Sequence, residues 1–239
     1  MVRLVLMVGL SYAIPAFAAA PGAKPAATNR AATQATTTQA ATTQSVPADP
    51  STPRGALKRL AQALDAGERA VVLDLLSAES DAQRKWATAT ADLAEATAAL
   101  RRSAVAGFGP QGSRGLAVDA AASPEALARI DGAEVAITGD SATVRPAQDE
   151  GPPIVLVRRD GRWRVPVSEF SRDVEAVDLD RAIAALADET RLLRELATEV
   201  SAGKYKTAAD ARQALDRRIL QSAMPQLEPV QPAATTMKP

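Results

Sequence analysis

The stretch IVLVRRDGRWRVPV, residues 154–167, decides the fold of this chain. Residues 154–157 form a short apolar run typical of a buried strand, and Asp160-Gly161 is a dipeptide that favours a tight hairpin turn. Pro166 cannot donate a ladder hydrogen bond, which indicates an edge position or an interruption near the end of the sheet. The apolar residues after the turn alternate with other residues and therefore line one face of a returning strand: Trp163, Val165 and Val167.

A second stretch upstream, VAITGDSATVRP at residues 135–146, repeats this pattern. Gly139-Asp140 predicts a turn between two segments of alternating apolar and polar or small side chains. Together the two stretches predict an antiparallel meander of three or four strands, with Trp163 as its largest core side chain. The apolar positions of the upstream segments are Val135, Ile137, Ala142 and Val144.

The residues before the meander follow helical rather than strand spacing. A first helix is expected from Pro53, with Thr52 as its cap, to a stop at Gly67. A second helix over residues 71–76 is apolar on too many sides for a surface helix and should be mostly buried. The chain is therefore expected to be an α+β protein whose N-terminal helices pack on the meander.

A longer helix is expected from Ser80 or Asp81 onward. The large apolar side chains along one side of this helix would pack inside the molecule, or alternatively against another chain as a coiled coil. Residues 107–115 are rich in glycine and are interpreted as a connector, and a further short helix begins at Ser123. The large side chains of the long helix lie seven residues apart: Trp86, Leu93 and Leu100.

Residues 172–222 return to helical spacing and predict a C-terminal helical hairpin. Its first helix ends at Gly203, and Thr207 with Asp210 resembles a capping box that starts the second. The hairpin either docks on the domain or projects as an arm, which would expose its stripe to a protein partner or to a second copy of the chain. The stripe of the first helix comprises Leu179, Ile183, Leu186, Leu193 and Val200.

Over residues 54–171 the helices and meander resemble the NTF2-like superfamily, which includes SnoaL-like and ketosteroid isomerase-like members. The resemblance implies a small cone-shaped α+β fold. Members include isomerases, dehydratases, hydrolases and non-catalytic binding or assembly domains, so the fold does not select a function. The segment SAGKYKTAADARQAL, residues 201–215, resembles segments of exported bacterial proteins of unknown function. The superfamily resemblance rests on two turn motifs, GDxAxV at Gly139, Asp140, Ala142 and Val144, and DGxWxV at Asp160, Gly161, Trp163 and Val165.

Residues 1–18 are typical of a signal peptide. Arg3 precedes an apolar run over residues 4–14, which is too short for a spanning helix of about 20 residues. The small residues before Ala19 favour cleavage at Ala18/Ala19; a cut after Ala20 and an uncleaved anchor are the alternatives. The mature protein is then expected to be periplasmic or secreted, with no stable membrane anchor.

Two polar segments flank the foldable region. Residues 19–53 are rich in Ala, Thr, Gln and Pro, which predicts a disordered tether because too little surface can be buried to offset the entropy of ordering. The threonine density would also suit O-glycosylation. Residues 223–239 are predicted to form a disordered tail, and the region between has the size of one domain.

The composition restricts the chemistry of the chain, which has no cysteine and no histidine. Disulfides, thiolate nucleophiles, His-based triads and imidazole metal sites are therefore excluded, and we expect no metal site and no cofactor. The 28 basic residues balance the 28 acidic residues, so the overall charge gives no reason to expect nucleic-acid binding.

The residues also give little support for acid–base catalysis. A ketosteroid isomerase-like site would need a tyrosine donor, and Tyr205 lies outside the resembling region. Acidic residues near the predicted strand ends are expected to be solvated turn or edge residues, and we assign no catalytic residue. These acidic residues are Asp131, Glu134 and Asp140.

A cluster of arginines is the one candidate ligand site, an anion-binding patch beside the predicted turns. Strand alternation places Arg162 and Arg164 on one outward face, where they could hold a carboxylate or phosphate group. The alternative is that these charges protect the sheet from edge-to-edge aggregation. The proposed patch comprises Arg145, Arg158, Arg162 and Arg164.

Two functions fit these observations. The favoured hypothesis is an exported, non-catalytic binding or assembly module of the bacterial cell envelope, which predicts a filled sheet face and an exposed helical stripe. The alternative is a small-molecule-binding NTF2-like domain, either without catalytic activity or as an isomerase- or hydrolase-like enzyme that uses a carboxylate. That alternative predicts a deep apolar cavity over the sheet with a buried carboxylate.

Overall fold

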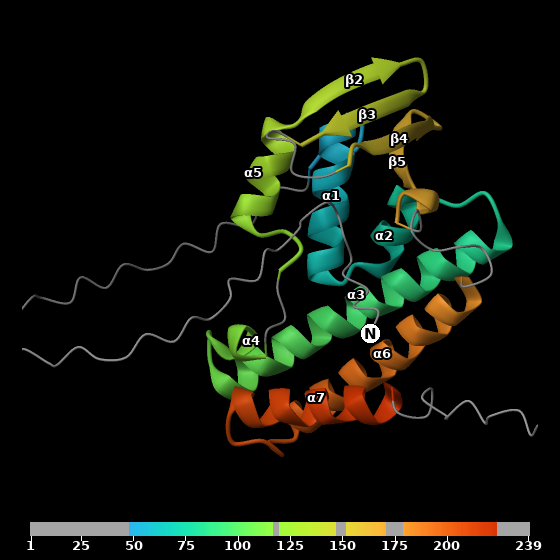
Figure 1. Ribbon diagram of the computed structural model, residues 1–239. Coiled ribbons are helices and arrows are strands. Elements are labelled where there is room, and N and C mark those ends of the chain that lie inside the picture. Colours follow the sequence, from blue (N-terminus) through green and yellow to red (C-terminus); the bar gives the residue numbers. More distant parts are fainter. Residues whose placement is uncertain (1–47, 117–119, 147–151, 171–178, 224–239) are drawn as a thin grey trace, which may run out of the picture.

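The computed structural model describes residues 48–116, 120–146, 152–170 and 179–223 (Figure 1). The predicted signal peptide with its cleavage site, most of the tether and nearly all of the tail lie outside the described residues. The described part is an α+β fold, as predicted, with a sheet at one end and a C-terminal helix pair, α6 (Leu179–Ser201) and α7 (Ala208–Ala223), at the other.

The sheet contains the predicted antiparallel meander of four strands. These are β2 (Glu134–Thr138), β3 (Ser141–Arg145), β4 (Ile154–Arg159) and β5 (Arg162–Pro166), paired in chain order. A fifth strand, β1 (Leu76–Ser77), pairs with β5 in parallel, which gives the order β1-β5-β4-β3-β2. Leu76 was expected in a helix; α2 (Arg69–Leu75) instead ends one residue earlier.

Both predicted turns are present, and their backbone angles explain the residues found there. Asp160 and Gly161 have φ values of 52° and 75° and join β4 to β5, as expected for a two-residue turn that matches strand twist. Gly139 has a φ of 60° and joins β2 to β3 together with Asp140. These turns fix the register and therefore decide which side chains reach the core.

One face of the sheet is filled by its own side chains and by α1 (Pro53–Ala66), which contacts β5 and β3. Trp163 is only 2% exposed, as predicted. Ile137 departs from the expected pattern, because its side chain is 57% exposed on the outermost strand. The buried residues of this face include Ala142, Val144, Leu156, Trp163 and Val165.

Short polar side chains begin the helices where the sequence predicts. The Thr52 hydroxyl accepts a hydrogen bond from the Gly55 amide at 3.1 Å, and Gly67 ends α1 with a φ of 72°. Contacts begin before the expected end of the tether, because the Trp163 amide donates to the Pro50 carbonyl at 3.2 Å. Ser80 and Ser123 cap α3 (Asp81–Phe108) and α5 (Pro124–Gly132) in the same way.

The glycine-rich stretch at residues 107–115 is more regular than the expected connector. Helix α3 continues to Phe108, and α4 (Gly112–Gly115) adds a further turn. A Cβ atom at Gly112 would lie 2.1 Å from the Ala104 carbonyl oxygen, so a glycine is needed for this close approach. Glycine here serves packing rather than chain flexibility.

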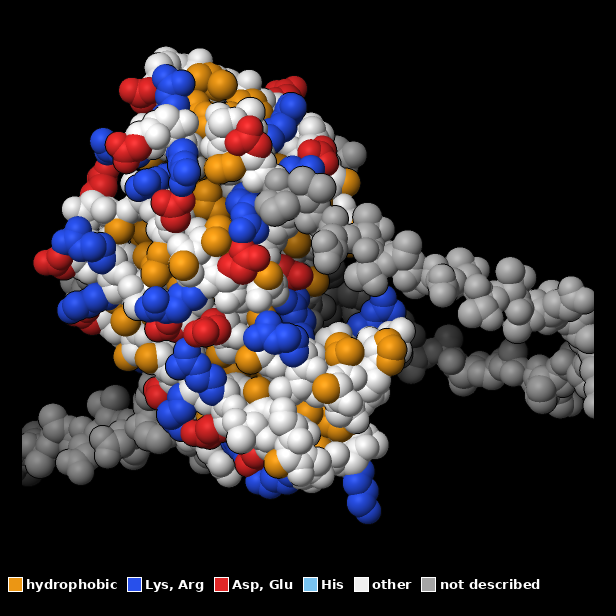
Figure 2. Space-filling view, turned by 180° about the vertical axis from the view of Figure 1, so that it is seen from behind, with side chains coloured by type: hydrophobic (Ala, Val, Ile, Leu, Met, Phe, Trp, Pro, Cys, Tyr) orange, Lys and Arg blue, Asp and Glu red, His pale blue; other side chains and the backbone are white. Residues whose placement is uncertain are grey.

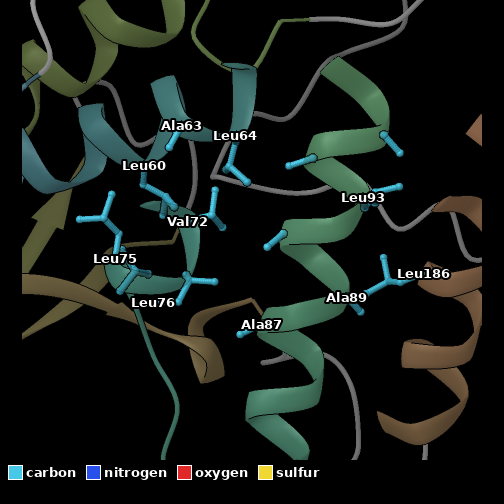
Figure 3. Close-up of a cluster of buried hydrophobic side chains, with 14 of the residues drawn as sticks. Leu60, Ala63, Leu64, Val72, Leu75, Leu76, Ala87, Ala89, Leu93 and Leu186 are labelled. Carbon is cyan, nitrogen blue, oxygen red and sulfur yellow. The ribbon is translucent and has the colours of Figure 1, made fainter. Parts of the chain in front are cut away.

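The C-terminal helices dock on the domain. Arg194 of α6 pairs with Glu95 of α3 at 3.3 Å, and Ser201 of α6 bonds Ser103 of α3 at 2.9 Å. Residue numbers thus rise together along both helices, so α3 and α6 lie side by side in parallel. In Figure 3 Leu186 reaches from α6 toward Ala89 of α3. The predicted stripe of α6 is therefore largely a core face.

Candidate functional site

The predicted arginine patch is largely neutralised by acidic side chains. Arg162 and Arg164 share Asp74 of α2 at 3.2 and 3.6 Å. Arg158 pairs with Asp140 at 2.9 Å, and its guanidinium lies 5.5 Å from the centre of the Trp163 ring. These ion pairs join the β4–β5 turn to α2 and to the β2–β3 turn, which favours a structural role for the arginines.

Arg145, the fourth member of the predicted patch, lies apart from the others. It is opposite Glu134 at the far end of β3, whereas Arg159 and Arg162 flank the turn at the other end of β4. Arg159 is six positions after Pro153, so at about 3.3 Å per residue these ends lie about 20 Å apart. Arg145 and the turn arginines therefore do not form one site.

The acidic residues considered as catalytic bases lie on the surface. The Asp131 carboxylate accepts a hydrogen bond from the Lys58 ammonium at 2.9 Å, and its side chain is 58% exposed. Asp140 is occupied by Arg158, and Glu134 is exposed on β2. None of the three lies in the buried, apolar surroundings of the carboxylate base that the enzyme-like alternative predicts.

An open groove lies between α3 and α6. It has a volume of about 680 Å³ and runs along the N-terminal half of α3 and the middle of α6. Sequence reasoning missed this site, because each helix reveals its own stripe but not the helix that will lie beside it. The lining residues are Asp81, Arg84, Lys85, Thr88, Ala89, Asp92, Ile183, Ala187, Thr190 and Arg194.

The groove combines a floor of small and apolar side chains with a charged rim. Ala89, Ile183 and Ala187 lie among the lining residues and let a ligand approach the helix backbones closely. The rim carries both signs of charge. Asp92 pairs with Arg69 at 2.5 Å, and within the described part of the chain Lys85 has no ion-pair partner.

Charges of both signs are also interspersed over the face of the molecule shown in Figure 2. Hydrophobic side chains appear there in small separate areas rather than as one broad patch. This distribution agrees with the balanced composition and gives no extended basic surface on that face for a polyanion. Recognition by this chain would depend on local shape and individual charges.

A compact polar cluster joins α6 to α7. Glu199 accepts hydrogen bonds from the Lys204 ammonium at 2.6 Å, the Tyr205 hydroxyl at 2.5 Å and the Arg218 guanidinium at 2.7 Å. These donors, Lys204 and Tyr205 foremost, lower the pKa of Glu199 to about 2. The cluster lies within or beside the segment at residues 201–215, which gives that segment a structural role.

The cluster predicts a pH-dependent loss of stability. Because the pKa of Glu199 falls from 4.5 to about 2 on folding, its contribution is full above pH 4.5 and is lost as pH falls toward 2. Glu199→Gln should lower the free energy of unfolding at pH 7 by about 1–2 kcal/mol, because Arg218 loses its charged partner. Urea unfolding between pH 7 and pH 2 measures this loss.

Glu195→Gln is the matched control for this prediction, since Glu195 forms an exposed ion pair with Arg191 on the same helix. Its cost should stay below about 0.5 kcal/mol. Equal costs for the two variants at pH 7, or a Glu199→Gln cost that persists unchanged at pH 2, would contradict the assigned role of Glu199.

Within the described ranges, acidic side chains nowhere gather in a group of three or more that could hold a metal ion. The described helices include none with the length and apolar character to cross a membrane. Comparison with models of known protein families, with curated proteins and with solved structures finds no significant match for the chain.

Proposed function

We propose that this chain is an exported, non-catalytic binding or assembly module of the bacterial cell envelope, and that it holds its partner in the α3–α6 groove. The observation that carries the proposal is the groove itself, an open channel with a small-residue floor between two parallel helices. Export is proposed from the character of residues 1–18 alone.

The filled sheet face favours this function over the small-molecule alternative. An NTF2-like enzyme would need a cavity over the sheet with a buried carboxylate, whereas Trp163 and Leu156 there are buried in the core cluster together with Leu57 and Leu60 of α1. The acidic residues near the strand ends face solvent. The superfamily resemblance thus remains a proposal about fold and supplies no catalytic site.

The chemistry of the groove indicates what kind of partner segment would fit. A helix with one apolar side can lie along two parallel helices, using the space left by Ala89 and Ala187. Lys85 on the rim forms no ion pair within the described part of the chain, since the nearby Asp81 pairs with Arg84, and Lys85 would attract a carboxylate of that segment. We therefore propose an amphipathic helix with acidic flanks as the ligand.

Deleting residues 172–222 is unsuitable as a test of partner binding, because Leu186, Leu196 and Val200 of α6 belong to the core and their loss would destabilise the domain. Ala187→Arg instead fills the groove from an exposed position, and Ala185→Arg places the same side chain on α6 away from the groove lining. Cross-linked envelope extracts should yield a partner with the wild type and with Ala185→Arg. Recovery should fall about tenfold or more with Ala187→Arg.

The partner's contact segment is then mapped by cross-link sites and tested as a synthetic peptide. Tenfold weaker peptide binding to Ala187→Arg than to Ala185→Arg, at equal thermal stability, supports the groove. Equal recovery with both variants, or cross-links that map to the sheet face, contradict it. A small molecule that stabilises the wild type, and whose binding is lost in the Trp163→Phe variant, would instead support the small-molecule alternative.

A further inference from the structure

The outer strand β2 presents an open edge. It pairs only with β3 in the described sheet and is the last strand in the order. Figure 1 shows β2 on the outside of the molecule, with its free side turned away from the other elements. Its sequence is Glu134-Val135-Ala136-Ile137-Thr138, with one charge and no proline.

The opposite edge of the sheet is blunted in a way that β2 is not. Strand β1 has only two residues, and Ser80, the cap of α3, follows after two further residues. Natural edge strands are protected by shortness, central charges, proline or bulges. The register of β2 with β3 is continuous over five pairs, and its one charge, Glu134, lies at its end. The β2 edge therefore lacks the usual protection.

The two-residue turn determines which backbone groups of β2 are free. Thr138 and Ser141 close the turn, so they form a hydrogen-bonded pair, and pairs alternate along the ladder from there. Ala136 therefore bonds Thr143 of β3. Val135 and Ile137 direct their amide and carbonyl groups toward the open edge, where a further strand could bond both.

We propose that the β2 edge pairs antiparallel with β2 of a second copy of this chain, about a two-fold axis at Ala136. In this register Ala136 faces its own counterpart, Val135 faces Ile137 of the second copy, and Glu134 faces Thr138. The two Glu134 charges are thereby kept apart, whereas registers shifted toward Glu134 would bring them opposite each other. About four backbone hydrogen bonds form across the two-fold axis.

The side chains of β2 also favour a second copy of this chain as the partner. Val135 is half-buried and Ile137 is 57% exposed, and both lie on the sheet face that carries the core. Pairing would place each Ile137 beside Val135 of the second copy and would extend the apolar face across the dimer. This inference uses the sheet edge and is independent of the groove proposed above.

Cysteine cross-linking tests the register, because the native chain has no cysteine. Facing Ala136 residues form a non-hydrogen-bonded pair with Cα atoms about 4.5 Å apart, within disulfide range. Thr138 lies on the same outer face, but its counterpart would be about 14 Å away. Under mild oxidation, Ala136→Cys should give about tenfold more disulfide dimer than Thr138→Cys.

A third variant tests whether backbone pairing at the β2 edge is responsible for the dimer. Ile137→Pro removes an amide that points outward, so in the Ala136→Cys background it should reduce the dimer to the Thr138→Cys level while circular dichroism shows a folded chain. Retention of the dimer in that folded variant would overturn the proposal. So would equal yields from the two single cysteines, or a wholly monomeric Ala136→Cys chain, which would leave the edge to a different peptide.

Discussion

Replacing Leu186 by alanine is expected to lower the free energy of unfolding by about 3 kcal/mol, because a buried leucine loses its contacts and leaves a cavity. The Leu186 side chain is 1% exposed and points from α6 toward α3 (Figure 3). Since α3 also contacts α1 and α2, the substitution should destabilise the whole described domain rather than α6 alone. Urea unfolding followed by circular dichroism measures the change.

The control for this prediction is Ala185→Ser, an exposed neighbour on the same helix whose cost should be about 0.5 kcal/mol. A projecting arm would behave differently, because losing a leucine from an arm leaves the domain's unfolding midpoint unchanged. Similar midpoints for both variants would therefore refute the docking of α6. A single cooperative transition with a lower midpoint for Leu186→Ala would support it.

The parts of the fold that were predictable depend on short-range chemistry. Asp160-Gly161 and Gly139-Asp140 determine hairpins because a two-residue turn restricts the backbone angles and pairs the adjacent strands. Thr207 and Asp210 form the predicted capping box, in which each side chain accepts a hydrogen bond from the other's amide. These signals lie within a few residues and need no knowledge of distant contacts.

The parts that were missed depend on contacts between distant segments. Strand β1 is two residues long and pairs with Val165 and Pro166, far along the chain, so in the sequence Leu76 resembles the end of a helix. The parallel alignment of α3 and α6 is likewise invisible in either helix alone. Glycine at residues 107–115 indicates a loop by composition, whereas Gly112 is required by close packing on Ala104.

The candidate site likewise combines features that local sequence predicts with features that depend on distant contacts. Alternation correctly places Arg162 and Arg164 on one face of β5, but it cannot show that Asp74 of α2 reaches both of them. The groove is built from residues about a hundred positions apart, such as Thr88 and Ala187. A surface formed by two segments becomes predictable only when their relative placement is known.

Trp163→Ala is expected to have the largest effect on stability, about 4 kcal/mol, because the indole is the largest side chain in the face between the sheet and α1. The Trp163 ring is buried by that contact and is also covered by the Arg158 guanidinium, 5.5 Å from the ring centre. The stacked cation adds about 0.5–1 kcal/mol at an exposed site. Unfolding can still be followed by fluorescence, because Trp86 remains.

Trp163→Phe separates packing from the presence of a ligand cavity. If the sheet face is a filled core, phenylalanine should restore much of the lost stability, since it refills most of the space left by alanine. A face with a preformed cavity would instead tolerate alanine at a cost below about 1 kcal/mol, because the indole would already border empty space. That outcome would revive the small-molecule alternative. A large loss with alanine and partial recovery with phenylalanine would leave the helical groove and the β2 edge as the surfaces through which this chain acts.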